Sequence, residues 1–441
     1  MNAAVPKPYD LCIVGSGMAG LSAALFAARR GLSTIVVGRT GEIIFATGFL
    51  DLLAVPAPET GEVWDDPWAG LAALTAAQPR HPYARIPAER IRSAFDGLVA
   101  FLAEQGLPYV GEGDRNVQAV TSVGTLKTTY RVPATAWNGV VALGRRSPGL
   151  IADIQGLKGF SARQIAATLG ERWPGVRTTR LSLPGSTGPG EVFPERLARS
   201  LEVAASREAL AAELRPRLGT AAVVGLPAVL GVSGSAEVLR DLETRLGVPA
   251  FEIPTMPPGV TGLRLKEAFE RGLKGLGVTL CLESRVVRTE ADPGGGFRLH
   301  AGPVRDVEEV IAARAVILAT GRFMGGGLKA DRQRVSETLF HLPVSHPVRR
   351  DDWHREDFLD RRGHPINRAG VEVDAAFRPV DAAGRVVHPR LHAAGSILAH
   401  QDWMRMKCGS GLAIATAWAA VEGVLPQNGA AGRDPALRGP S

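Results

Sequence analysis

Gly15-Ser16-Gly17-Met18-Ala19-Gly20 is the stretch that decides the fold of this chain. An apolar run, residues 11–14, precedes it; an Ala-rich run, residues 21–30, follows it, and a second apolar run covers residues 34–37. This order predicts strand, glycine-rich turn, helix and strand, the βαβ setting that a dinucleotide-binding fingerprint needs. Gly15 suits the tight turn, Gly17 lets a pyrophosphate approach the backbone, and Gly20 lets helix and strand pack closely. The helix N-terminus then offers N–H groups and partial positive charge to a phosphate.

A carboxylate is missing where such a fingerprint usually has one. The second strand should end in Asp or Glu, which holds the ribose hydroxyls of an adenosine half. By spacing, that place falls at Gly38, and Arg39 follows it. The gap weakens the case for ordinary FAD or NAD binding. Two interpretations of Arg39 stay open: it meets a phosphate, as in NADP sites, or it is a solvated surface charge.

Size and composition are those of a globular protein with two or three domains and a large core. The 441 residues are 45% hydrophobic and 22% charged, and the formal net charge is +7. A basic surface favours anionic substrates, anionic lipid or nucleic acid. Because the charges are dispersed, with no basic run and no aromatic-basic signature, we expect no nucleic-acid partner.

The cysteines and the apolar segments bear on metals and location. Cys12, Cys281 and Cys408 lie far apart in the sequence, which has no CxxC pair, so we expect no metal site. We find no signal peptide and no apolar run of about 18 residues, the length that a membrane span needs. We therefore expect a cytoplasmic protein whose membrane association, if any, is peripheral or through a partner.

Two later segments complete the fingerprint. Residues 315–321 form an apolar strand that ends in Thr320-Gly321, after a helical pattern over residues 263–276. Residues 391–396 form a strand that ends in Ala-Gly-Ser, and an Ala-rich helix starts near Gly411. We expect the three segments to form one flavin site, with this helix start facing the pyrimidine edge of the ring and stabilising negative charge there. The alternative is a glycine-rich helix start selected for packing alone.

The predicted fold class is α/β: a two-dinucleotide-binding-domain flavoprotein, Rossmann-like with a parallel sheet, and an inserted α/β cap domain. The flavin-binding domain should comprise residues 1–85, 253–330 and 371–425. The cap should comprise residues 86–252 with a return segment at 331–370, and residues 426–441 should be a disordered tail.

The candidate site residues are of two kinds. Catalytic residues are not identified, but the candidates are Lys127, Arg264 and His346. Lys127 lies in a polar strand that could equally be solvated, Arg264 could bind an anion or serve structure, and His346 lies among histidines without metal spacing. The cofactor-binding candidates are Gly15, Gly17, Ala19, Gly20, Arg39, Gly48, Thr320, Gly321, Gly395, Gly409, Gly411 and Leu412.

Over essentially its full length, the chain resembles the family of B subunits of the anaerobic glycerol-3-phosphate dehydrogenases. The Asp-Leu-Leu and Pro-Thr-x-Pro-Pro segments are far more specific than the glycine fingerprint. The matching segments are Thr47-Gly48-Phe49-Leu50-Asp51-Leu52-Leu53, His81-Pro82-Tyr83, Gly124-Thr125-Leu126-Lys127-Thr128-Thr129, Pro254-Thr255-Met256-Pro257-Pro258, Gly262-Leu263-Arg264-Leu265, Ala319-Thr320-Gly321-Arg322-Phe323, Gly325-Gly326-Gly327-Leu328, Ala394-Gly395-Ser396 and Cys408-Gly409-Ser410-Gly411.

The resemblance implies a flavoprotein that binds FMN, with FAD as the alternative. It implies two partners: a catalytic A subunit that carries FAD, and an iron–sulfur C subunit that anchors the complex at the inner face of the membrane. Together they would oxidise sn-glycerol 3-phosphate and pass electrons to quinone. FMN has no adenosine, which would account for Gly38, a feature that this family shares. One departure is a bulkier, more polar segment at residues 397–406.

Two other functions stay open. The chain could be a self-contained flavin oxidoreductase of the fumarate-reductase or ketosteroid-dehydrogenase type, acting on its own anionic substrate. It could also be a non-catalytic scaffold that keeps the fold and binds another protein of the complex.

Overall fold

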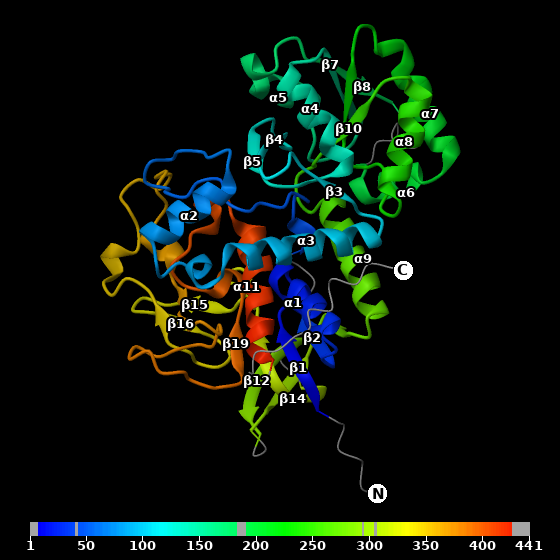
Figure 1. Ribbon diagram of the computed structural model, residues 1–441. Helices are drawn as coiled ribbons and strands as arrows, with labels where there is room; N and C mark the ends of the chain where they lie inside the picture. The colour runs from blue at the N-terminus through cyan, green and yellow to red at the C-terminus, as the bar shows by residue number, and fades with distance from the viewer. Residues whose placement is uncertain (1–7, 40–42, 183–190, 293–294, 304–306, 426–441) are drawn as a thin grey trace, which may run out of the picture.

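A computed structural model describes residues 8–39, 43–182, 191–292, 295–303 and 307–425 (Figure 1). Two sheets built mainly of parallel strands dominate it. The larger one lies among α1, α11 and α9, and the smaller one forms a separate lobe with its own helices. The mixed α/β class with parallel sheets that the sequence predicts is therefore confirmed.

The larger sheet has the strand order β11-β2-β1-β14-β13-β12, and β19 pairs with β14. Its centre is parallel: Cys12 of β1 lies between Ile35 of β2 and Val316 of β14. Strands β12 and β13 form an antiparallel hairpin at one edge. The strands are β1 (Tyr9–Val14), β2 (Thr34–Gly38), β11 (Thr279–Leu282), β12 (Arg285–Ala291), β13 (Phe297–Gly302), β14 (Glu309–Leu318) and β19 (Leu391–Ala393).

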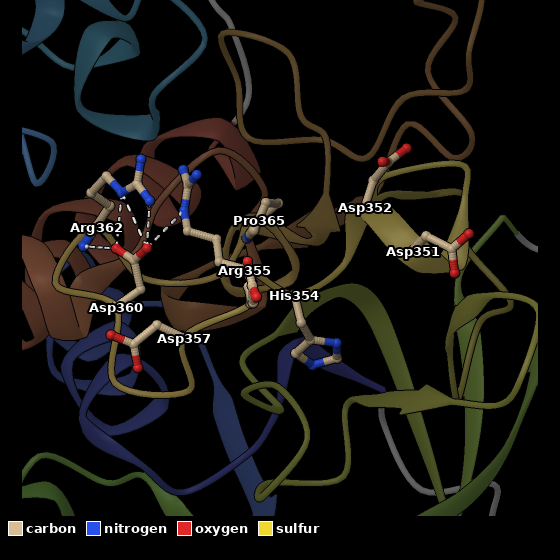
Figure 2. Close-up of a pocket in the computed structure, with 9 residues that line it drawn as sticks. Asp351, Asp352, His354, Arg355, Asp357, Asp360, Arg362 and Pro365 are labelled. Atoms are coloured by element: carbon tan, nitrogen blue, oxygen red, sulfur yellow. Dashed lines mark hydrogen bonds and ion pairs between the residues drawn. The ribbon is translucent and has the colours of Figure 1, made fainter.

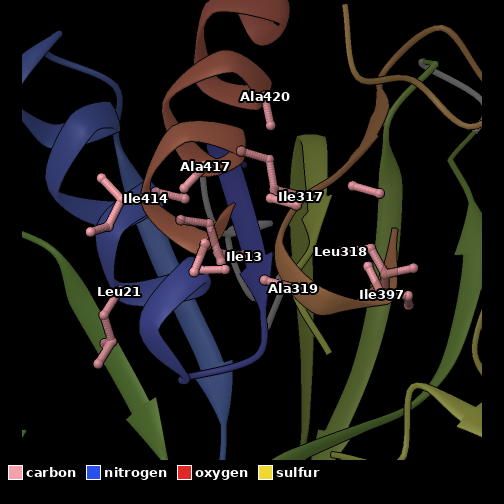
Figure 3. Packing of buried hydrophobic residues seen from close by; sticks show 14 of the residues in the cluster. Ile13, Leu21, Ile317, Leu318, Ala319, Ile397, Ile414, Ala417 and Ala420 are labelled. Atoms are coloured by element: carbon pink, nitrogen blue, oxygen red, sulfur yellow. The ribbon is translucent and has the colours of Figure 1, made fainter. Parts of the chain in front are cut away.

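Helices α1 (Met18–Arg29) and α11 (Gly409–Val424) pack against each other beside the central strands. Figure 3 shows Leu21 of α1 and Ile414 of α11 next to Ile13 and Ile317 of the sheet. Alanines occupy much of both helices, so the backbones approach closely. The strands between them are buried on both faces, which explains their continuous apolar runs.

The inserted lobe contains a four-stranded parallel sheet in the order β10-β9-β7-β8 (Figure 1). Its strands are β7 (Gly149–Ile154), β8 (Arg177–Leu181), β9 (Val223–Pro227) and β10 (Ala250–Ile253). Its helices are α4 (Trp137–Arg145), α5 (Ala162–Leu169), α6 (Pro194–Leu201), α7 (Ala204–Leu214) and α8 (Ser235–Leu246).

Helices α3 (Ala88–Glu104) and α9 (Val260–Gly275) cross the junction of the two lobes (Figure 1). Phe101 of α3 packs on Phe269 of α9, with ring centroids 5.6 Å apart, and both belong to the core of the larger sheet. The remaining elements are α2 (Pro67–Ala77), β3 (Tyr109–Val110), β4 (Val117–Val120), β5 (Leu126–Thr129), β6 (Val132–Pro133), β15 (Leu328–Ala330), β16 (Val335–Glu337), β17 (Val344–Ser345), β18 (Gly370–Val371) and α10 (Trp403–Met406).

Several sequence expectations can be compared with these elements. The residue pattern over 193–212 predicts one helix, and this prediction is wrong, because α6 and α7 are separate helices. Glu202 lies at the break between the two helices. Its carboxylate accepts hydrogen bonds from the N–H groups of Val232 and Ser233, and these contacts favour an interrupted helix. The predicted tail at residues 426–441 lies outside the described residues. The domain boundaries stay predictions, although α3, expected in the cap, packs in the core of the larger sheet.

The described residues contain neither a membrane-spanning helix nor a metal-ligand cluster. Within those ranges, we find no helix with both the length and the apolar character needed to cross a bilayer. In the same part of the chain, no group of three or more His, Cys, Asp or Glu side chains is placed to hold a metal ion.

Candidate flavin site

A cavity of about 610 Å³ lies beside the glycine loop, between the end of β2, the start of β12 and the end of β14. Four predicted cofactor-binding residues line it: Gly15, Gly17, Arg39 and Thr320. The other lining residues are Val14, Ser16, Val37, Gly38, Ser284, Arg285, Val286, Val287, Ala319, Met324, Gly325, Gly326, Thr338 and Leu339.

The glycine loop is built so that an anion can reach the start of α1. Gly15 has φ +119°, and a Cβ there would lie 2.2 Å from the carbonyl oxygen of Ala319. A Cβ on Gly20 would lie 1.8 Å from the Gly15 carbonyl oxygen, so helix and loop touch only because residue 20 is glycine. Helix α1 has no side-chain cap and no acidic residue in its first turn. Its first N–H groups therefore remain for a ligand.

Position 38, where a carboxylate is usual, has no room for a side chain, because Ser16 of the glycine loop packs against it. A Cβ on Gly38 would lie 2.6 Å from the Ser16 nitrogen and 2.7 Å from its Oγ. Ser16 Oγ donates a hydrogen bond to the Arg39 carbonyl oxygen at 2.9 Å, which holds the two segments together. Arg39 and Arg285 are exposed and are the charged residues among those that line the cavity. No carboxylate-bearing residue belongs to this described lining.

Thr320 supplies a polar group with no protein partner. Its Oγ1 is buried and makes no hydrogen bond within the described part of the chain. Gly321, which follows, has φ +68°. An uncapped helix start, a glycine loop that a Cβ would fill and an unpartnered hydroxyl beside one cavity fit the phosphate end of a flavin nucleotide.

The remaining cofactor-binding candidates lie along α1 and α11. Gly395 packs on Ala19, where a Cβ on Gly395 would lie 2.6 Å from the Ala19 Cβ, and its N–H donates to Thr416 Oγ1 at 2.8 Å. Gly411 N–H donates to the Asp51 carbonyl at 2.7 Å, so this amide already has a partner in the protein. Gly409 and Leu412 belong to the same first turn of α11.

Residues 46–53 form an irregular but firmly held segment across the start of α11. Gly48 has φ +84°, and its carbonyl accepts a hydrogen bond from Tyr109 Oη at 2.7 Å. Tyr83 Oη donates to the Leu52 carbonyl at 2.8 Å. Burial raises the pKa of both tyrosines, so both hydroxyls remain protonated donors. The segment is therefore a fixed wall beside the first turn of α11, outside the lining of the cavity described above.

An ion pair joins two of the matching segments at this wall. Lys127 Nζ lies 2.9 Å from Asp51 Oδ2, and the ammonium also lies 5.9 Å from the centroid of the Phe49 ring. Asp51 is 8% exposed, and its other carboxylate oxygen, Oδ1, is buried without a hydrogen-bond partner in the described residues. Asp51 is not among the sequence's candidate site residues. The signal that could have found it is the Asp-Leu-Leu segment.

Arg264 is committed to the protein interior. It is 3% exposed, and its guanidinium pairs with Glu252 through two contacts of 2.6 and 2.8 Å. Its Nε donates to the Gly231 carbonyl at 2.8 Å. Burial raises the pKa of Glu252, but the charge and hydrogen bonds of Arg264 outweigh burial and leave that pKa lowered. With these partners Arg264 has no free face for a ligand, and we leave it out of the proposed site.

His346 also has protein partners. Its Nδ1 lies 2.8 Å from the Pro347 carbonyl, Val335 N–H donates to its Nε2 at 3.4 Å, and its ring meets Trp353 edge to face. These contacts position a loop and leave no nitrogen for a proton transfer.

A second cavity, of about 770 Å³, lies in the loops at residues 351–365 (Figure 2). In this cavity Arg362 binds Asp360 through contacts of 2.9 and 2.5 Å, and Arg355 approaches the same carboxylate (Figure 2). These hydrogen bonds hold the pKa of Asp360 well below its usual range. The further carboxylates of the lining, Asp351, Asp352, Glu356 and Asp357, make it acidic. None of the predicted cofactor-binding residues lines this cavity, so we do not assign the flavin to it.

Comparisons with known proteins bear on the family of the chain. The family model described as an FAD binding domain matches residues 10–412. The chain is 29% identical to the B subunit of an anaerobic glycerol-3-phosphate dehydrogenase from Vibrio vulnificus (strain YJ016), over 94% of this chain and 95% of that protein. It is also 29% identical to the protein of the same name from Pectobacterium atrosepticum, over 95% of this chain and 99% of the relative.

Two solved structures are similar over most of the chain. One is a 3-ketosteroid delta1-dehydrogenase from Sterolibacterium denitrificans, at 12% identity and TM-score 0.42, over 95% of this chain and 99% of that one. The other is a flavocytochrome c3 fumarate reductase, at 10% identity and TM-score 0.41, over 96% of this chain and 79% of that one.

Proposed function

Because this chain belongs to the FAD binding domain family, we propose that it is the flavoprotein B subunit of an anaerobic glycerol-3-phosphate dehydrogenase. In this proposal the complex oxidises sn-glycerol 3-phosphate to dihydroxyacetone phosphate and passes the electrons to quinone. The similarity to proteins that carry this name, which extends over 94% of the chain, supports the assignment.

One observation carries the proposal: sequence-distant segments that match the family of B subunits meet at one place. The Asp51 segment, the Lys127 segment and the start of α11 are joined by the Asp51–Lys127 ion pair and by the Gly411 to Asp51 hydrogen bond. Nucleotide binding by the glycine loop does not by itself require these three segments to meet, because none of them belongs to that loop.

The residues of the site would then have distinct roles. The start of α1 would bind the cofactor phosphate, and Thr320 Oγ1 would donate to it or to the adjoining chain. The wall of residues 46–53 and the first turn of α11 would orient the ring and exclude water. A flavin bound there supplies the two-electron redox chemistry.

FMN is the proposed cofactor. The closed position at Gly38 and the absence of carboxylates from the described cavity lining leave no acidic partner for adenosine ribose hydroxyls. FAD is the second candidate, because the cavity continues past the glycine loop to residues 284–287 at the start of β12. Denaturing the purified protein and identifying the released flavin by chromatography distinguishes the two.

The proposed partners are a catalytic A subunit that carries FAD and an iron–sulfur C subunit that anchors the complex to the membrane. Through them the chain would work in the cytoplasm, peripherally at the inner face of the membrane. The A subunit would make the direct contact with glycerol 3-phosphate.

Anaerobic reduction assays test this division of labour. We expect purified protein to carry flavin, to be reduced slowly by glycerol 3-phosphate alone, and to be reduced rapidly once the A subunit is added. Rapid reduction of the isolated chain would instead indicate a self-contained oxidoreductase. A protein that neither FMN nor FAD can reconstitute would indicate a scaffold.

A further inference from the structure

We propose that Arg39 and Arg285 form a clamp for the terminal phosphate of FMN, and that this clamp sets the preference of the cavity for FMN over FAD. The inference rests on the proposed function, because it takes the cavity beside the glycine loop as the flavin site. Both arginines determine specificity in this role, and neither is required to touch the reacting ring.

The fold brings the two arginines to the same edge of the larger sheet. Strands β2 and β11 are parallel neighbours, and their last residues, Gly38 and Leu282, lie opposite each other. Arg39 follows the first of these directly. Glu283 follows the second with φ +68°, and this turn leads to Arg285 at the start of β12. Both arginines therefore lie where the two strands end, and both line the cavity that contains the glycine loop.

Each arginine is held beside the loops that line the cavity. Ser16 Oγ of the glycine loop donates to the Arg39 carbonyl oxygen at 2.9 Å, which fixes the backbone of Arg39 next to the start of α1. The guanidinium of Arg285 lies over Gly326, where a Cβ would come within 2.7 Å of the arginine Nη2. Because Gly326 is itself a lining residue, the Arg285 guanidinium lies against the cavity wall.

The positive charge of the cavity has no counterpart in its own lining. Among the described residues, neither Arg39 nor Arg285 has an ion-pair partner, whereas Arg288 of β12 pairs with Glu290 at 3.1 Å. The described lining contains no carboxylate, and the uncapped start of α1 adds partial positive charge. Two guanidinium groups and a helix start at one cavity favour an anionic ligand.

The kind of anion follows from the chemistry of the two cofactors. A terminal phosphate, as in FMN, carries a charge of about −1.5 to −2 at pH 7 and presents three acceptor oxygens, to which guanidinium groups bind bidentately. In FAD each phosphate is bonded on both sides and has fewer free oxygens. Its adenosine ribose would come to the end of β2, where Arg39 offers the ribose hydroxyls no acceptor. The two arginines therefore favour the mononucleotide.

Equilibrium binding of three flavins to the flavin-free full chain tests the clamp, with flavin fluorescence as the signal. Riboflavin has the ring of FMN without the phosphate, so we expect the wild type to bind FMN about 100-fold more tightly than riboflavin. Arg39→Met and Arg285→Met should each weaken FMN binding about tenfold and leave riboflavin binding within about twofold. The affinity for FAD should change by less than about threefold, so the preference for FMN should decrease.

Two further variants control the comparison. Arg285→Lys keeps the charge but loses the bidentate contact, and its FMN affinity should fall between those of the wild type and Arg285→Met. Arg163→Met is the matched control, since Arg163 is an exposed arginine on α5 of the inserted lobe and does not line the cavity. Because Arg39 and Arg285 are also exposed, all these variants should unfold at the wild-type temperature when flavin is absent.

The outcomes separate the inference from the proposed function. A loss of affinity confined to FMN supports the clamp. An equal loss for FMN and riboflavin, or an FMN affinity that matches that of Arg163→Met, overturns it. A wild-type chain that binds FAD more tightly than FMN also overturns it and leaves the flavoprotein assignment standing. A wild-type chain that binds no flavin overturns both.

Discussion

The two sheets of this molecule differ in the loop that connects a central parallel strand to the next helix. In the inserted lobe, the loop between β9 and α8 is filled by the protein: Glu202 accepts the N–H groups of Val232 and Ser233, each at 2.8 Å. Glu252 accepts that of Leu230 at 2.7 Å, and Arg264 neutralises Glu252. In the larger sheet, the loop between β1 and α1 has neither a carboxylate nor a side-chain cap.

The difference shows that topology alone does not make a nucleotide site. Both loops follow a buried parallel strand and lead into a helix, and both present N–H groups that need an anion. The inserted lobe supplies its own anions from Glu202 and Glu252. The larger sheet leaves the place open, with a cavity and the unpartnered Thr320 hydroxyl beside it.

The largest expected effect concerns the loop between β9 and α8, whose N–H groups are bound by Glu202 and Glu252. Arg264→Leu leaves the Glu252 carboxylate buried and unpaired, and should lower the free energy of unfolding by about 3–5 kcal/mol. Denaturant titration measures the loss. Arg199→Leu, at an arginine whose side chain is 50% exposed, should change stability by less than about 1 kcal/mol.

The double variant Arg264→Leu with Glu252→Gln sharpens this test. Gln keeps an acceptor for the Leu230 N–H but carries no charge, so most of the lost stability should return. Equal instability of the single and double variants would show that the pair matters for its packing and not for its charge.

The next effect tests the open loop. Gly15→Ala places a Cβ against the Ala319 carbonyl at a φ of +119°, so the loop must move. We expect complete loss of bound flavin and a decrease of about 2 kcal/mol or more in stability. Absorbance of the purified protein and denaturant titration report the two effects. Gly31→Ala is the control for positive φ alone, because nothing lies within 4 Å of a Cβ there; retained flavin in Gly15→Ala would contradict the assignment of the loop.

Acid should distinguish the two regions as well. His81 packs in the larger region, and burial, together with Arg368 and His400, lowers its pKa to about 3. In the unfolded chain His81 is therefore protonated below about pH 6.5, whereas in the folded chain it stays neutral down to about pH 3. Below that pH the stability contributed by neutral His81 should fall by about 1.4 kcal/mol per pH unit, down to pH about 3.

Glu252 acts in a lower pH range. Its pKa is lowered in the folded state, so its contribution is complete above about pH 4.5 and is lost only as the pH falls further. Denaturant titrations from pH 7 to 4.5 should therefore show an acid-dependent slope that His81→Gln reduces. Burial also lowers the pKa of His388, His392 and His400, and these histidines supply the rest of the slope. His354→Gln, at an exposed histidine, should leave the slope unchanged; an unchanged slope in His81→Gln would contradict the prediction.

The parts of the fold that the sequence predicts well are those with a local signal. The glycine loop, the Ala-Thr-Gly strand end at Thr320 and the Ala-rich helix after Gly411 each follow from a short run of residues. The break between α6 and α7 depends on Glu202 reaching a loop that is distant in the sequence, and no periodicity indicates it.

The site shows the same limit. Gly38 indicates a missing carboxylate, but only the structure shows Ser16 filling that place. From the sequence, Arg264 could either bind an anion or have a structural role. The sequence does not decide between them, because its partner Glu252 belongs to another element. Sequence reasoning misses Asp51 for the same reason: its relation to Lys127 exists only once the hairpin β4–β5 folds against residues 46–53.

The smallest expected effect compares two threonines on either side of the open loop. Thr320 Oγ1 has no partner in the described chain, whereas Thr416 Oγ1 accepts from Gly395 N–H and donates to the Leu412 carbonyl. Thr320→Val should leave the stability of the flavin-free protein within about 0.5 kcal/mol and weaken flavin binding about tenfold. Thr416→Val should instead destabilise the flavin-free protein by about 1–2 kcal/mol, because it leaves a buried N–H unpaired. Thermal unfolding without flavin and fluorescence titration with it measure both; a Thr320→Val protein that loses stability but binds flavin normally would mean that this hydroxyl serves the fold and faces no ligand.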